Sequence, residues 1–276
     1  IKLFITGGLF DAEVEGEPGV LRMPLDIAQA VCEEAHKLGL RTSAHIESTE
    51  GVEVGLKAGV DTIEHGAPLT DELLKLFKKN GLGNASSLTC TLSPALPFAV
   101  LSPEKTHSTH VQKVNGRVVY EGVATATRQA LANGIPVGLG TDSACPFVTH
   151  YDMWREVVYF QRHTGVTPEF ALHTATLKNA QLLGVANETG SIETGKSADF
   201  IVLDVNPLDD LCALRNVEQV YMAGKPVKYK AKHLPKIDAE LDGIMDGLDN
   251  DPFVSEWNIA GEKKSLNPFA KRGAKE

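Results

Sequence analysis

Apolar positions along the first half of the chain follow two alternating patterns, one typical of strands and one typical of helices. Short runs rich in apolar and β-branched residues predict strands at 1–8, 41–46, 62–65, 85–92 and 135–143. Between these runs, apolar residues at helical spacing predict helices at 24–38, 49–58, 71–79 and 117–133. Strands and helices that alternate in this way favour parallel strands with right-handed crossovers, so the sequence predicts an α/β fold.

The pattern changes in the second half of the chain. A helix is predicted over 167–183, because a threonine suited to the N-cap is followed by proline at the first helical position. After it, 190–204 is expected to form a turn and a strand pair, and 217–228 a hairpin. These are features of a small sheet separate from the α/β part. Residues 229–276 are polar, with an acidic amphipathic stretch, and are expected to form a tail or a docking helix.

One long segment, 93–116, contains proline and has a poor helical pattern. It is interpreted as a loop of the kind that often covers a binding site. His107 and His110 would share a face only if this segment were helical. A solvated loop is therefore favoured over a metal site at this pair.

Composition and charge narrow the classes of function. The 276 residues include 27 basic and 36 acidic side chains, for a net charge of −9, and no basic cluster of the kind that binds nucleic acid. No apolar run approaches the roughly 20 residues that a membrane-spanning helix needs. Four widely spaced cysteines without a CxxC pair favour free thiols in a reducing compartment, so we expect a cytoplasmic protein. The chain opens at Ile1 inside a predicted strand, which leads us to expect an N-terminal portion before it.

Two histidines end neighbouring predicted strands. His45 and His65 fall at the C-terminal ends of the strands at 41–46 and 62–65, the end at which α/β folds carry their chemistry. Two imidazoles at one rim can share a metal ion. Asp142, after a glycine-containing strand, is a third candidate for the same rim. Each has a structural alternative when taken alone, since a strand-end histidine can be a hydrogen-bonded structural residue and an aspartate can cap a helix.

Several motifs occur in an order that resembles the amidohydrolase superfamily, in its imidazolonepropionase-like and prolidase-like branch. They are a strand with Lys2 followed by TGG, strands that end in AHI, EHG and GTDS, and the segment GSIETGKSADFIVLD. The resemblance covers Ile1 to about Lys228. It implies a (β/α)8 TIM barrel with a small β-sandwich built from both chain ends.

The resemblance also implies a division of the chain. Residues 1–187 correspond to the C-terminal part of the barrel, strands four to eight, so the barrel is expected to be incomplete at its N-terminus. Residues 188–228 correspond to part of the sandwich, and 229–276 to an acidic, polar tail. The family's first strand carries an HxH pair of metal ligands, and no HxH occurs in the 276 residues.

The resemblance implies four metal ligands: Lys2, His45, His65 and Asp142. Lys2, carboxylated by CO2, would bridge two divalent ions, for which zinc is expected; without carboxylation one ion is expected. Asp142 would be catalytic as well, taking the proton of the attacking water and passing it to the leaving nitrogen. His150 and Arg155 fall where the family makes substrate contacts.

The implied activity is hydrolysis of amide or peptide-like C–N bonds in small molecules by metal-activated hydroxide. A prolidase-like dipeptidase or an N-acyl amino-acid hydrolase is expected. Two alternatives stay open at this point. One is a deaminase or imidazolone-type hydrolase with a single metal, and the other is a catalytically inactive fragment or scaffold. The expected partner is a small-molecule substrate, with neither nucleic acid nor membrane, and a homo-oligomer is left open.

Overall fold

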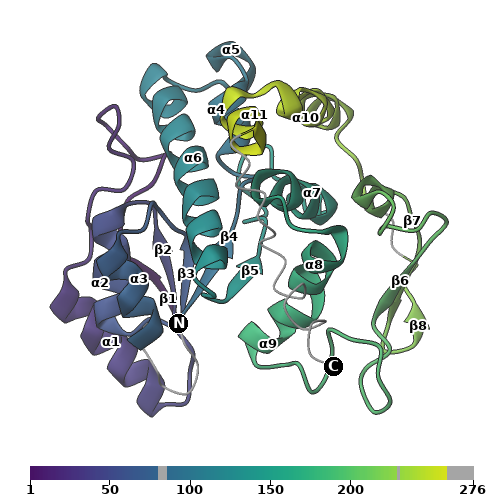
Figure 1. Ribbon diagram of the computed structural model, residues 1–276, viewed down its shortest axis with the longest axis horizontal. Coiled ribbons are helices and arrows are strands. Elements are labelled where there is room, and N and C mark those ends of the chain that lie inside the picture. Colours follow the sequence, from purple (N-terminus) through teal and green to yellow (C-terminus); the bar gives the residue numbers. More distant parts are fainter. Residues whose placement is uncertain (80–85, 229–230, 260–276) are drawn as a thin grey trace. The chain divides into compact units, whose positions relative to one another are not determined.

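The computed structural model of the chain describes residues 1–79, 86–228 and 231–259. The chain divides into two compact units, Ile1–Gly140 and Thr141–Glu276. The first unit holds a parallel sheet with its helices, and the second holds further helices and a small antiparallel sheet (Figure 1). The domain boundaries expected near residues 187 and 228 stay a prediction.

Five parallel strands, paired in the order of the sequence, form the centre of the first unit. They are β1 (Lys2–Phe4), β2 (Ser43–Ile46), β3 (Thr62–His65), β4 (Ser87–Cys90) and β5 (Val137–Leu139). Each lies within a range predicted from the sequence. Consecutive parallel strands with helical crossovers are the arrangement of part of a (β/α)8 barrel, so the predicted fold class is confirmed.

Helices cover one face of this sheet. The longer ones are α1 (Leu25–Lys37), α2 (Thr49–Ala58), α3 (Asp71–Lys79) and α6 (His110–Ala132). Figure 1 shows α1, α2 and α3 side by side along the strands. Two glycines permit the close approach of α2: a Cβ at Gly51 would lie 2.2 Å from Thr6 Cγ2, and one at Gly55 would lie 2.7 Å from Ile46 Cδ1. This face of the sheet is therefore packed with buried apolar side chains.

The opposite face of the sheet is more polar and partly open. Lys2 and Phe4 alternate along β1 with buried residues, and Phe4 is 55% exposed. On the next strands, Ser43 Oγ donates a hydrogen bond to Glu64 Oε1 at 2.7 Å. The register places Phe4 opposite His45. In a complete (β/α)8 barrel this face of the sheet would line the interior, and it is the face that carries His45.

The prediction of a loop at 93–116 is wrong. The segment contains two short helices and the start of α6: α4 (Leu96–Val100), α5 (Pro103–Thr106) and the residues from His110 onward. A capping box begins α6, because Thr109 Oγ1 accepts the backbone N–H of Gln112 and the Gln112 side chain accepts that of Thr109. His107 ends α5 with a φ of 52°, so it shares no helix face with His110.

The second unit combines helices with three short strands. The elements are α7 (Met153–Thr164), α8 (Pro168–His173), α9 (Asn179–Leu183), β6 (Phe200–Leu203), β7 (Val217–Met222), β8 (Lys225–Pro226), α10 (Pro235–Gly247) and α11 (Pro252–Ile259). A π-helical turn, Thr174–Lys178, joins α8 to α9 within the predicted helix at 167–183. None of the helices in the described ranges is both long and apolar enough to cross a bilayer.

The small sheet differs in part from its prediction. The hairpin expected in 217–228 is confirmed as β7 and β8, with positive φ at both turn residues, Ala223 and Gly224. The pair expected within 190–204 is a single strand, β6, that pairs with β7. The residues before it form a turn, in which Lys196 Nζ donates to Ser191 Oγ at 2.6 Å.

Asp61, an aspartate between α1 and the sheet, stabilises the first unit through its hydrogen bonds. Asp61 Oδ2 accepts hydrogen bonds from the backbone N–H of Thr42 at 2.7 Å and from its hydroxyl at 3.0 Å, and it lies 2.9 Å from His36 Nε2. Burial alone would raise the pKa of Asp61, but these hydrogen bonds and the charge of His36 together lower it.

Asp61→Asn is expected to lower the free energy of unfolding by roughly 1.5–3 kcal/mol at pH 7, because a hydrogen-bonded carboxylate is lost. A lowered folded-state pKa stabilises the fold above the usual value of 3.8, and this contribution disappears as the pH falls through the folded-state pKa. Urea unfolding at pH 7 and at stepwise lower pH should therefore show a difference between wild type and variant that narrows in acid. A difference that stays constant with pH would contradict this origin.

Candidate metal centre

His45 projects from the end of β2 on the polar face of the sheet. Its ring stacks on Phe4, with 4.1 Å between ring centroids, and its residue exposure is 9%. Its Nε2 lies 3.2 Å from the carbonyl oxygen of Gly7, which follows β1. These contacts fix the ring at the C-terminal end of the strand, as the sequence predicted.

His65 is the last residue of β3 and reaches the same end by a backbone turn. Strand alternation would put His65 on the helix-covered side with Ile63, but its φ of 68° changes the direction of the chain. The His65 ring then lies edge-on to the His45 ring, 4.7 Å between centroids, and its Nδ1 lies 2.6 Å from Thr91 Oγ1. Burial, followed by the charges of His45 and Lys2, holds the pKa of His65 well below its usual 6.5, so the imidazole is neutral.

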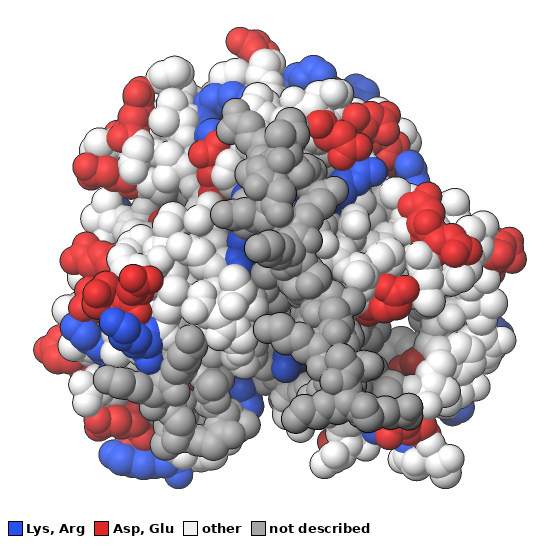
Figure 2. Space-filling model, in the orientation of Figure 1, with Lys and Arg blue, Asp and Glu red and all other residues white. Residues whose placement is uncertain are grey.

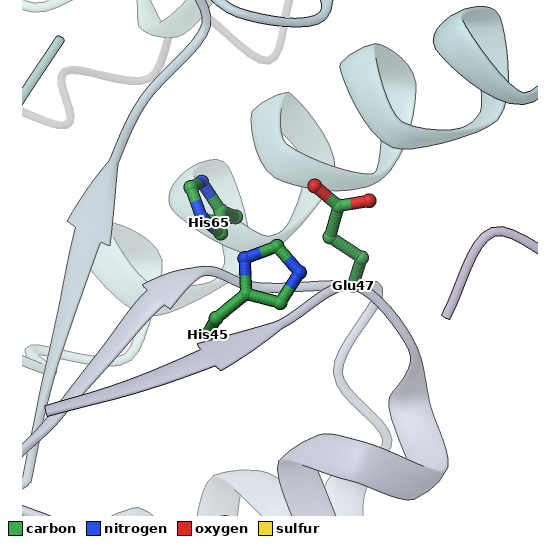
Figure 3. Close-up of side chains that lie close together, drawn as sticks. All are labelled: His45, Glu47 and His65. Atoms are coloured by element: carbon green, nitrogen blue, oxygen red, sulfur yellow. The ribbon is translucent and has the colours of Figure 1, made fainter. Parts of the chain in front are cut away.

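Glu47 joins the two histidines and is a residue that the sequence analysis missed. Its backbone N–H donates to Thr6 Oγ1 at 2.9 Å, and its Oε2 accepts the backbone N–H of Leu9 at 2.8 Å. One donor atom from each of His45, Glu47 and His65 lies within 4.8 Å of the other two (Figure 3). A His-x-Glu pattern at the C-terminal end of a strand was the available sequence signal.

Glycine is needed beside this cluster. A Cβ at Gly8 would lie 2.9 Å from His45 Nε2 and 3.0 Å from Glu47 Oε2. Contacts this short displace at least one of the two side chains. The TGG sequence after β1 therefore gives the imidazole and the carboxylate the space in which they meet.

A cavity of about 510 Å³ adjoins the cluster, and Glu47 forms part of its wall. The rest of the wall comes from the loop before α1, the start of α2, the loop after β3 and the middle of α6. The lining residues besides Glu47 are 16–21, 48–50, 66–68, 118, 119 and 122. A cavity of this volume has the size of a small-molecule site.

Comparisons with known proteins place most of the chain in one family. The family model described as "Amidohydrolase family" matches residues 6–227. The chain belongs to the amidohydrolase family. The resemblance that the motifs suggested is thereby confirmed.

Relatives of this amidohydrolase include enzymes with different names. Ochratoxinase of Aspergillus niger is 26% identical over 83% of the chain and 46% of its own length. Imidazolonepropionase of Streptococcus sanguinis is 27% identical over 73% of the chain and 44% of its own length. The chain thus spans about half the length of these curated relatives.

Solved structures show the same fold. A crystal structure of a candidate prolidase from Bifidobacterium longum is 44% identical, with a TM-score of 0.83, over 89% of this chain and 60% of that one. A crystal structure of a Xaa-Pro dipeptidase with methionine bound in its active site is 29% identical, with a TM-score of 0.71, over 82% of this chain and 54% of that one.

The other expected site residues of the amidohydrolase have distinct surroundings. Lys2 lies on β1 opposite Ser43, on the polar face of the sheet, and its charge lowers the pKa of His65. Asp142 lies in the second unit, three residues after β5, exposed and with a φ of 54°. The Cys145 thiol donates to Asp142 Oδ2 at 3.2 Å.

The two expected substrate contacts differ in exposure. His150 is exposed and its ring lies edge-on to Tyr151. Arg155 is only 2% exposed and is bonded to Asp152 and Asp242 within the second unit. These contacts give Arg155 a structural role, and a substrate contact by it stays a prediction.

The donor set of the cluster fits a divalent metal ion. Two imidazoles and one carboxylate are the donors found in catalytic zinc sites, which keep a further position open for water or substrate. Neutral His65 has a nitrogen lone pair that it can donate to a metal ion, and the Leu9 N–H holds the carboxylate of Glu47 in place. This chain can thus hold one ion at His45, Glu47 and His65.

Proposed function

We propose that the chain carries a large part of the active site of a metal-dependent hydrolase that cleaves C–N bonds of small molecules. The observation that carries this proposal is the cluster of His45, Glu47 and His65 at the C-terminal ends of parallel strands, beside a cavity. The family membership supports hydrolysis, and the prolidase and dipeptidase names among the solved neighbours support a dipeptide-like substrate.

In this proposal His45, Glu47 and His65 hold a divalent ion, expected to be zinc. When bound, the ion supplies Lewis-acid polarisation of the scissile carbonyl and lowers the pKa of water. Asp142 accepts the proton of the attacking water and delivers it to the leaving nitrogen, for which an exposed carboxylate is suited. Lys2, as a carbamate, would add an anionic ligand and allow a second ion.

The cavity wall contacts the substrate in this proposal, and the family resemblance by itself adds His150 as a substrate contact. The wall combines carboxylates with apolar side chains, among them Glu17, Val20 and Val118. Apolar walls bury the side chains of a dipeptide or an N-acyl amino acid, and a few polar groups orient the bond to be cleaved.

A single-metal hydrolase of the imidazolone type is the second candidate. It is favoured by the fact that three donors meet within one compact unit, which is enough for one ion. The imidazolonepropionase relatives point the same way. In this case Lys2 stays an amine and its role is electrostatic.

The test combines metal analysis with substrate assays, on this chain and on any full-length protein that contains it. We expect two zinc ions per full-length molecule. We also expect hydrolysis of Xaa-Pro dipeptides or N-acyl amino acids, an activity that a chelator abolishes and added zinc restores. One ion and turnover of imidazolone compounds would favour the second candidate. Full-length protein that neither binds metal nor hydrolyses any of these compounds would refute the proposal and leave a scaffold.

A further inference from the structure

Each histidine of the cluster has one ring nitrogen tied to the end of a neighbouring strand. His45 Nε2 lies 3.2 Å from the Gly7 carbonyl beyond β1, and His65 Nδ1 lies 2.6 Å from the hydroxyl of Thr91, the residue after β4. A carbonyl oxygen only accepts, so Nε2 of His45 carries a hydrogen in this contact, and Nδ1 is the nitrogen that a ligand would use. The two contacts thus bear on which nitrogen of each ring is available to a ligand.

We propose that Thr91 is the positioning residue of His65, whose Nδ1–H it accepts, so that the Nε2 lone pair is left for the metal ion. This rests on the proposed function only in naming a metal as the ligand. Histidines that bind metals generally donate their other N–H to a fixed acceptor, which sets the tautomer and the ring orientation. Thr91 supplies that acceptor from the residue after β4, and the sequence analysis gave it no role.

Burial makes this contact important for the ring. Thr91 is 4% exposed and His65 5%, so an imidazole N–H that lost the hydroxyl could not turn to bulk water. The strand itself does not hold the ring, since the φ of 68° takes His65 out of the regular pleat. The side chain of Thr91 is stiff, because its β-branched carbon restricts rotation. A stiff acceptor at 2.6 Å therefore determines where the opposite nitrogen, Nε2, points.

The experiment compares three variants of the full chain: Thr91→Val, Thr91→Ser and Thr89→Val. Valine has the shape of threonine but accepts no hydrogen bond, whereas serine keeps the hydroxyl. Thr89 is the matched control, because it lies on β4 two residues before Thr91 and its hydroxyl is 3.1 Å from Thr62 Oγ1, which is not part of the cluster. Two quantities are measured: the Zn2+ dissociation constant by chelator competition, and the His65 tautomer by long-range proton–nitrogen NMR of the metal-free chain.

Wild type, Thr91→Ser and Thr89→Val are expected to show His65 protonated at Nδ1 and to bind Zn2+ alike. Thr91→Val is expected to shift the tautomer toward Nε2–H and to weaken Zn2+ binding by roughly 10–100-fold. His65→Ala assigns the NMR signal.

Several outcomes would overturn the proposal. An Nε2–H tautomer in the wild type would mean that Thr91 donates, and unchanged Zn2+ affinity in folded Thr91→Val would remove its positioning role. If Thr91→Val fails to fold, the His65 tautomer in the wild type and in Thr91→Ser still tests whether Thr91 accepts the Nδ1–H of His65. A wild-type chain that binds no Zn2+ would count against the proposed function. If His65 in that chain is still protonated at Nδ1, the role of Thr91 as its acceptor is supported independently.

Discussion

His65→Ala is expected to lower the Zn2+ affinity of the chain by more than 100-fold. His65 is one of three donors in the cluster and the one whose neutral state the structure favours most clearly, through burial. Removing a ligand leaves two donors, His45 and Glu47, which cannot complete a three-ligand site. The loss should therefore exceed the roughly 10–100-fold typical of residues that only orient a ligand.

The measurement is Zn2+ binding by chelator competition, with circular dichroism to show that the variant folds. His110→Ala is the matched control, because His110 is an exposed histidine at the start of α6, beside Glu15. It should bind Zn2+ as wild type does. Equal affinity in His65→Ala and wild type would show that the metal binds elsewhere, and would remove the cluster as the basis of the proposed function.

Arg155→Met is expected to lower the free energy of unfolding of the second unit by about 3–5 kcal/mol, since one partner of a buried ion pair is removed. Arg155 Nε donates to Asp152 Oδ2 at 3.1 Å and its Nη2 donates to Asp242 Oδ1 at 2.7 Å. The guanidinium also lies over the Trp154 ring, 4.5 Å from its centroid. Burial alone would lower the pKa of Arg155, but the bond to Asp242 and the charge of Asp152 raise it, so the side chain stays charged.

This ion pair joins α7 to the acidic helix α10. Figure 2 shows acidic side chains gathered where α10 lies, and Asp242 on this helix bonds Arg155 and Arg215. Leu241 and Ile244 of the same helix are buried. Methionine keeps much of the length of arginine but leaves Asp152, which is 7% exposed, without its charged partner.

Urea unfolding followed by tryptophan fluorescence measures the effect. Arg215→Met is the control, because the Arg215 side chain is 47% exposed and bonds the same aspartate at 2.8 Å. An exposed ion pair contributes at most about 1 kcal/mol, so this variant should be nearly as stable as wild type. If Arg155→Met is also stable, and only raises the KM of a substrate, then Arg155 contacts substrate as the family resemblance implies.

The sequence by itself determined the elements whose signals are local. Helix α2 begins and ends where its caps predict, because Ser48 Oγ accepts the Gly51 N–H and Gly59 has the left-handed φ of 85° that favours glycine. Strands β2 and β3 on either side are short apolar runs, and their βαβ connection makes them parallel neighbours. That geometry brings His45 and His65 to the same end of the sheet, whereas the side to which His65 projects depends on its positive φ of 68°.

Elements with weak local signals were not determined in this way. The start of α6 depends on a four-residue capping box, and residues 93–116 have a poor helical pattern, so the prediction of a loop there was wrong. The single strand β6 within 190–204 depends on its pairing with β7, which is not a property of its own sequence.

Only the tertiary structure decided which polar groups surround the histidines. Glu47 joins them because Thr6 and the Leu9 N–H, about forty residues earlier in the chain, hold its backbone and carboxylate. Thr91 lies beside His65 because β3 and β4 pair in one particular register. Arg155, for which a substrate contact stays a prediction, is paired with Asp242, 87 residues later. Local patterns specify strands and caps through short-range sterics and hydrogen bonds, whereas contacts between distant side chains depend on how packing brings the strands and helices together.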